Sequence, residues 1–104
     1  MDEKEGILES QTHQGMKVSK ITPALRTRLN LADGSGLVVI RVSENSPAED
    51  AGFRTGDILL LMDQVEIGGI KELNKKFQES TGGDSVLFSV KRGGEELFIM
   101  LDMP

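Results

Sequence analysis

Several kinds of side chain are scarce or missing in this chain of 104 residues. It has no cysteine, tryptophan or tyrosine, and His13 is its only histidine. The lack of cysteine excludes disulfides, thiolate zinc sites and cysteine nucleophiles. A lone histidine among polar residues has no neighbour with which to bind a metal or to transfer a proton. We therefore interpret His13 as a solvated residue and predict no metal site, no cofactor and no catalytic residue.

Long apolar runs and concentrated positive charge are also missing. No run approaches the roughly 18 apolar residues that span a membrane, and residues 1–5 lack the basic and apolar regions of a signal peptide. The net charge is −5, with 12 basic and 17 acidic residues, and the basic residues are scattered. Because nucleic-acid binding needs a concentrated basic surface, we expect neither a nucleic-acid partner nor direct membrane insertion.

The familiar enzyme motifs are absent as well. No serine lies in a nucleophile-elbow pattern, and a serine paired with a lysine is the one catalytic arrangement that remains open. The glycines at positions 34 and 36 precede a predicted strand instead of opening a helix, which is the wrong context for a dinucleotide loop. We interpret five carboxylates as solvated residues at turn and cap positions: Glu44, Glu49, Asp50, Asp57 and Asp63.

What remains is the composition of one small globular domain. Hydrophobic residues make up 38% of the chain, so one largely aliphatic core is expected at this length. Residues 1–14 are polar apart from Ile7 and Leu8, and ordering them would cost more entropy than their burial returns. We predict a flexible linker over 1–14 and a folded domain over 15–102.

Hydrophobic periodicity and turn residues predict the elements of this domain. Helices are predicted after Thr22-Pro23, after Ser46-Pro47 and over 70–80. In the second of these, Ser46 should cap the amide of Glu49 while the Glu49 carboxylate reaches back to the amide of Ser46. Strands are predicted over 15–21, 37–42, 58–62, 65–67, 85–91 and 95–101, with a Gly93-Gly94 turn between the last two.

The order of these motifs resembles a known family. The stretch Ser46-Pro47-Ala48-Glu49-Asp50-Ala51-Gly52-Phe53-Arg54-Thr55-Gly56-Asp57-Ile58-Leu59, preceded by Gly15-Met16-Lys17-Val18 and Thr22-Pro23, is similar to the circularly permuted PDZ domains of bacterial Do/HtrA-type serine proteases, and most of all to their second, C-terminal PDZ domain. The resemblance covers roughly residues 15–102. It implies an α+β fold, a small antiparallel β-sandwich or partly open barrel of five to six strands with two to three helices.

The resemblance also implies a site. In such domains a peptide adds as a strand between the sheet and a helix, and backbone amides hold its C-terminal carboxylate. Here the carboxylate ligands would be the backbone amides of Met16, Lys17 and Val18. Lys17 stands where the family's commoner loop has a second glycine. The peptide would lie between strand 15–21 and helix 70–80. The implied site residues are Gly15, Met16, Lys17, Val18, Ser19, Ile21, Ile70, Leu73, Asn74 and Phe77.

The resemblance leaves three hypotheses for function. The first is a peptide-binding module that captures C-terminal or exposed apolar segments of unfolded proteins, in protein quality control, for a protease domain of the same polypeptide in the periplasm or cell envelope. The second is an assembly or regulatory domain whose groove is vestigial. The third is a PDZ domain from another parent, such as a tail-specific or intramembrane protease or a secretion protein.

Overall fold

Strands contribute more residues than helices to the part of the chain that the structure, a computed structural model, describes: residues 10–31, 36–79 and 83–103. Within these ranges there are three helices, namely α2 (Pro23–Arg28), α3 (Pro47–Ala51) and α4 (Ile70–Glu79), and seven strands, namely β1 (Ser10–His13), β2 (Met16–Lys20), β3 (Leu37–Val42), β4 (Ile58–Met62), β5 (Val65–Glu66), β6 (Ser85–Arg92) and β7 (Glu95–Asp102). The predicted flexibility of residues 1–9, the turn at 33–35 and the helix end at residue 80 lie outside the described residues.

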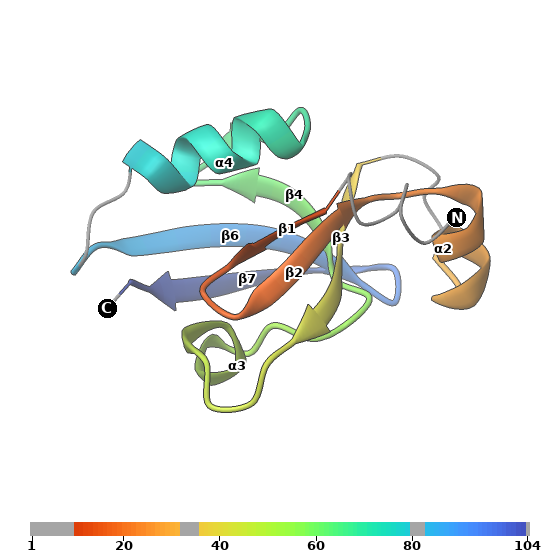
Figure 1. The fold of residues 1–104 in the computed structure, drawn as a ribbon, viewed down its shortest axis with the longest axis horizontal. Coiled ribbons are helices and arrows are strands. Elements are labelled where there is room, and N and C mark those ends of the chain that lie inside the picture. The colour runs from red at the N-terminus through yellow and green to blue at the C-terminus, as the bar shows by residue number, and fades with distance from the viewer. Residues whose placement is uncertain (1–9, 32–35, 80–82, 104) are drawn as a thin grey trace.

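The strands form one antiparallel sheet in the order β1-β2-β3-β4-β6-β7, with β5 paired to β4. In Figure 1, α4 runs along the top of the sheet, α3 lies at the bottom, and α2 is at the right-hand end. All six predicted strands are present within a residue or two of their predicted limits, and the α+β fold class is confirmed. The seventh strand, β1, comes from residues that the sequence analysis assigned to the flexible linker.

Two of the helices begin as their sequences predict. The Thr22 hydroxyl accepts a hydrogen bond from the amide of Leu25, and the Ser46 hydroxyl accepts one from the amide of Glu49. Proline follows each cap residue, where its missing N–H leaves no hydrogen bond unmade. The reciprocal half of the capping box differs by one residue, because the Glu49 carboxylate accepts from the amide of Asn45 rather than from Ser46.

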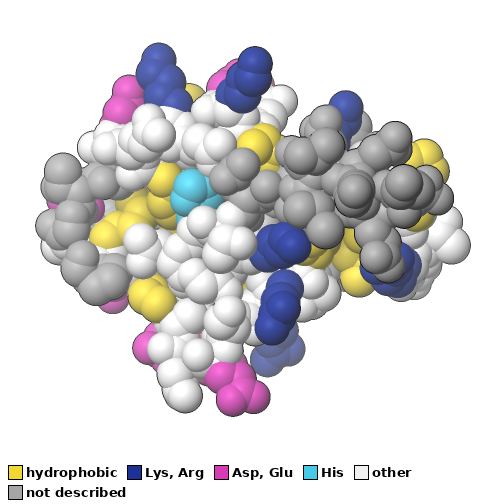
Figure 2. Space-filling view, in the orientation of Figure 1, with side chains coloured by type: hydrophobic (Ala, Val, Ile, Leu, Met, Phe, Trp, Pro, Cys, Tyr) yellow, Lys and Arg dark blue, Asp and Glu magenta, His cyan; other side chains and the backbone are white. Residues whose placement is uncertain are grey.

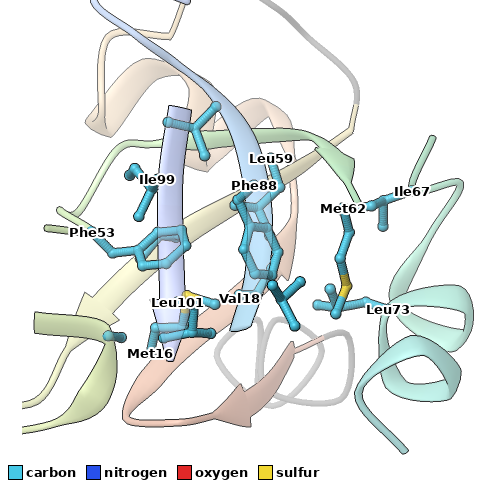
Figure 3. Packing of buried hydrophobic residues seen from close by; sticks show 14 of the residues in the cluster. Met16, Val18, Phe53, Leu59, Met62, Ile67, Leu73, Phe88, Ile99 and Leu101 are labelled. Carbon is cyan, nitrogen blue, oxygen red and sulfur yellow. The ribbon is translucent and has the colours of Figure 1, made fainter. Parts of the chain in front are cut away.

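The main core lies between the sheet and helices α3 and α4. Figure 3 shows Phe88 at its centre, with Phe53 on one side and Val18 on the other. The Phe53 and Phe88 rings meet edge to face at a centroid distance of 5.2 Å, a favoured geometry for aromatic pairs. A second, smaller cluster contains Ile21, Val38 and Ile58, with side chains of α2 packed against it.

An ion pair between a buried carboxylate and a partly exposed guanidinium joins the start of β4 to the end of β6. The side chain of Asp57 is fully buried, and its two carboxylate oxygens each accept a bond of 2.7 Å from the guanidinium of Arg92. The hydrogen bond with Asp57 raises the pKa of Arg92 above its ordinary value. The prediction of a solvated turn residue was therefore wrong for Asp57, because its partner lies far away in the sequence.

Candidate functional site

The edge of β2 that faces away from β3 is the centre of the candidate site. On this side β1 pairs with β2 in antiparallel register, and β1 also contacts α4. An extended segment of the chain therefore lies between the sheet and the helix that the resemblance named as the two walls of a groove. Next to the start of α4, Lys20, Leu37, Gly69 and Ile70 line a shallow depression that continues along the same wall.

A two-residue turn at Gln14 and Gly15 connects β1 to β2. Both residues have positive φ, 53° and 90°, which is typical of the tight turns that close β-hairpins. A Cβ atom at Gly15 would overlap the side chain of Ser46, so only glycine fits. The carbonyls of Gln14 and Gly15 accept hydrogen bonds of 3.0 and 2.8 Å from the amides of Ala48 and Ser43. The turn is thus attached to the loop that opens α3.

His13, the last residue of β1, fills the space between β2 and α4. Its ring stacks on Phe77 with a centroid distance of 4.2 Å and an interplanar angle of 8°. Its Nε2 atom donates to the Oδ1 atom of Asn74 at 2.6 Å. Figure 2 shows the imidazole near the middle of this face, with apolar side chains on one side of it. The interpretation of His13 as a solvated linker residue was therefore wrong.

The structure brings most of the residues implied by the resemblance together. Met16, Val18 and Leu73 are completely buried, with Phe77 beside them in the main core, and Asn74 and Ile70 are half-buried on α4. Gly15 lies in the turn, and Lys17 is half-buried on β2.

Two of the implied residues lie elsewhere. Ser19 is buried, and its hydroxyl donates to the carbonyl of Lys20. Ile21 packs in the second cluster with Val38 and Ile58 instead of facing α4. We therefore leave Ile21 out of the groove.

The three amides implied as carboxylate ligands do not converge. Met16, Lys17 and Val18 all belong to β2, and successive amides of a strand point to opposite edges. The register of the hairpin, in which His13 faces Met16 next to a two-residue turn, directs the amides of Met16 and Val18 toward β1 and that of Lys17 toward β3. Two of the three amides therefore face the groove.

Other site chemistries find no support in the described ranges. No cluster of three or more His, Asp or Glu side chains there could hold a metal ion. No helix in the described residues is both long enough and apolar enough to cross a membrane.

Comparison with known proteins identifies the class of domain. The family described as PDZ domain matches residues 8–102, so the chain belongs to the PDZ family. Its relatives include proteases that are named as DegP-like or HtrA-type. A probable periplasmic serine endoprotease, DegP-like, from Chlamydia trachomatis is 35% identical over 88 residues, which cover 84% of this chain and 18% of the relative. The magnetosome formation protease MamE of Magnetospirillum gryphiswaldense is 33% identical over 81 residues, 78% of this chain and 10% of that protein.

Solved structures agree with this assignment. The HtrA3 PDZ domain bound to a phage-derived ligand, FGRWV, superimposes with a TM-score of 0.71 and 25% identity, covering 89% of this chain and 85% of that one. The HtrA-type protease AlgW with a decapeptide gives a TM-score of 0.79 at 24% identity over 94% of this chain and 31% of that one, which supports the fold. The chain spans less than a fifth of the curated relatives above. Their protease domain lies outside the matched region, and the chain itself is a binding module.

Sequence reasoning missed β1 and, with it, the role of His13. The available signal was the Gln14-Gly15 pair, since glycine at the second position of a two-residue turn is typical of a hairpin. The signal was weak because residues 10–13 are all polar and show no apolar alternation.

Proposed function

We propose that this PDZ domain binds the C-terminal segments of other polypeptides by adding them as a strand to the edge of β2, opposite α4. The chemistry of recognition is an extended backbone with a free carboxylate and an apolar last side chain. The carboxylate would sit beside the amide of Met16, and the side chain would contact Phe77. By likeness to the relatives, the bound segments would be presented to a protease domain of the same polypeptide, in the periplasm or cell envelope.

One observation carries this proposal. The edge of β2 already holds a strand, because β1 pairs with it over four residues in antiparallel register. A free strand edge is a template for any extended chain, and the main-chain hydrogen bonds do not depend on the sequence of the added segment. The fully buried Met16 and Val18 provide an apolar floor beneath this edge. Methionine adapts readily to side chains of different shapes.

The test compares two forms of one peptide. FGRWV with a free carboxylate should bind with a Kd in the roughly micromolar to millimolar range, because so small an interface gains little net free energy. FGRWV with an amidated C-terminus should bind about tenfold to a hundredfold more weakly, a cost of ~1–3 kcal/mol for unmatched polar groups. Titration followed by amide chemical shifts gives both constants and locates the site. Equal affinity, or no shifts along β2 and α4 at saturation, would refute the proposal.

A matched pair of variants tests the wall of the groove. Phe77→Ala should weaken binding of the free-acid peptide, whereas Phe98→Ala should leave it unchanged, because the Phe98 side chain is 69% exposed on the outer face of β7. Phe77 also belongs to the core, so the unfolding free energy of both variants must be measured in parallel. Loss of binding in Phe98→Ala would place the peptide on another surface.

Assembly is the second candidate function, and exposed apolar side chains favour it. Phe98 and Met100 are 69% and 50% exposed, and β7 ends the described sheet. Exposed apolar side chains beside a free strand edge are typical of contact surfaces between proteins. Sedimentation equilibrium of the wild type and of Phe98→Ser distinguishes the two candidates, since an assembly domain should self-associate through this strand and lose that association in the variant.

A further inference from the structure

We propose that β1 is an internal ligand of the groove, held in place by His13, and that an external peptide binds only by displacing it. The second half of this inference, the displacement of β1 by an external peptide, rests on the proposed function. The first half, that the groove is already occupied by the chain itself, concerns only the described residues 10–16 and their contacts with β2 and α4.

The direction of β1 is that of a bound peptide. Ser10 pairs with Ser19 and His13 with Met16, so β1 runs antiparallel to β2 with its last residue at the start of β2. A peptide whose carboxylate lies beside the amide of Met16 would run the same way. Two segments cannot pair with one strand edge at once, because each backbone N–H and C=O group of that edge is used once. Peptide and β1 therefore exclude one another.

His13 occupies the position of the ligand's last side chain. It is half-buried, with one ring face on Phe77 and its Nε2–H directed at the amide oxygen of Asn74. Phe77 and Asn74 both lie on α4. Together they form a narrow slot for a planar ring that stacks on Phe77 and donates a hydrogen bond to Asn74. Thr12, the preceding residue, is exposed and points away from this slot.

The strand is attached firmly at one end only. Its turn is held by two backbone hydrogen bonds, from the amide of Ser43 in the loop before α3 and from the amide of Ala48 in the first turn of α3, and these do not involve β1 itself. The four residues of β1 are all polar, so the strand has little apolar surface to bury. Segments with few buried apolar contacts open at low free-energy cost. The chain can therefore leave the groove from residue 13 backward while the turn at Gln14 and Gly15 stays in place.

Self-occupation sets the affinity for any external peptide. The connection through a two-residue turn gives β1 a high effective concentration at the groove, without any strong contact. The apparent Kd of a competing peptide then equals its intrinsic Kd divided by the fraction of molecules in which β1 has left. A change that weakens only the attachment of β1 should therefore tighten peptide binding, the reverse of what an ordinary groove mutation does.

The experiment compares His13→Ala with Thr12→Ala, which shortens the neighbouring side chain on the exposed face of the same strand. Without peptide, exchange of the backbone amides of residues 13, 16 and 18 should accelerate roughly tenfold in His13→Ala, because one ring stack and one hydrogen bond are lost. Thr12→Ala should stay within about twofold of the wild type on the same reasoning. His13→Phe keeps the stack but loses the donor to Asn74, and it should fall between them.

Titration of the same variants with free-acid FGRWV completes the test. His13→Ala should bind roughly tenfold more tightly than the wild type, by the same loss of stack and hydrogen bond. Equal affinity and equal exchange in all variants, with the residue 13 amide still protected at saturating peptide, would overturn the internal-ligand proposal and leave peptide binding intact. Absence of binding even in His13→Ala, when exchange shows that β1 has been released, would instead refute the proposed function and the displacement with it.

Discussion

Replacing Gly15 with alanine should destabilise the domain more than a glycine-to-alanine change usually does. Gly15 has φ of +90°, a conformation that costs an L-residue ~1–2 kcal/mol. A Cβ atom there also overlaps the Ser46 side chain, which is only 7% exposed and caps α3. Forcing an extra methyl into such a site typically costs ~1–3 kcal/mol. The two effects together predict a loss of about 2 to 5 kcal/mol.

Gly94→Ala is the matched control. Gly94 has φ of +88°, almost the same as Gly15, but nothing lies within 4 Å of the position of its Cβ. It should lose only the backbone cost of ~1–2 kcal/mol. The difference of about 2 kcal/mol between the two variants then measures the overlap with Ser46. In the double variant Gly15→Ala/Ser46→Gly most of this difference should be recovered, because glycine is a tolerable helix cap and its use costs only a few tenths of a kcal/mol.

Urea unfolding monitored by far-UV circular dichroism is the suitable assay, since the chain has no tryptophan or tyrosine to report by fluorescence. For a domain of this size the midpoints of Gly15→Ala and Gly94→Ala should differ by roughly 1 M urea. Equal midpoints for the two variants, or a double variant no more stable than Gly15→Ala alone, would refute the close approach of the turn to Ser46.

Three further predictions concern the ion pair, the core and catalysis. Arg92→Met should lower the free energy of unfolding by ~3–5 kcal/mol, because it leaves the buried carboxylate of Asp57 without its charge partner. The control is Arg54→Met, at an exposed side chain, which should cost less than about 0.5 kcal/mol in the same thermal or urea unfolding assay. Because the pKa of Arg92 is raised, its contribution to the stability of the fold is complete below the ordinary pKa of arginine and is lost only as pH rises through the raised value. Plots of unfolding free energy between about pH 5 and 9 should therefore show no transition from this group. Phe88→Ala should lose ~3–5 kcal/mol and Phe98→Ala less than about 0.5, since the first side chain is fully buried and the second is exposed. Incubation of the chain with unfolded casein should give no cleavage products on gels, and reproducible cleavage abolished by one serine or lysine substitution would contradict a pure binding module.

Local patterns in the sequence predicted most of the fold. The caps at Thr22 and Ser46 and the turn at Gly93 and Gly94 each involve residues close in sequence, and the structure confirms them. The stripe of Leu73 and Phe77 on α4 is buried as its helical spacing predicts. These signals are reliable because they depend on neighbours within one turn of helix or one hairpin.

Features that depend on distant partners could not be predicted. Asp57 looks like a turn residue until the sheet brings Arg92 to it from 35 residues away. Residues 10–13 have no apolar periodicity, and they form a strand only through pairing with β2 and contact with α4. The site was predicted in part for the same reason: the floor and wall follow from local periodicity, but the segment lying between them does not.

The ion pair between Asp57 and Arg92 also bears on when the domain can fold during its synthesis. Because translation proceeds from the N-terminus, Asp57 is synthesised 35 residues before its partner. Until Arg92 is made, the donor to the Asp57 carboxylate is the backbone amide of Arg54. Burying a carboxylate without a cationic partner is costly. The start of β4 should therefore remain hydrated until β6 is complete. We expect the nascent chain to acquire protease resistance in one late step, after residue 92 has emerged, rather than strand by strand.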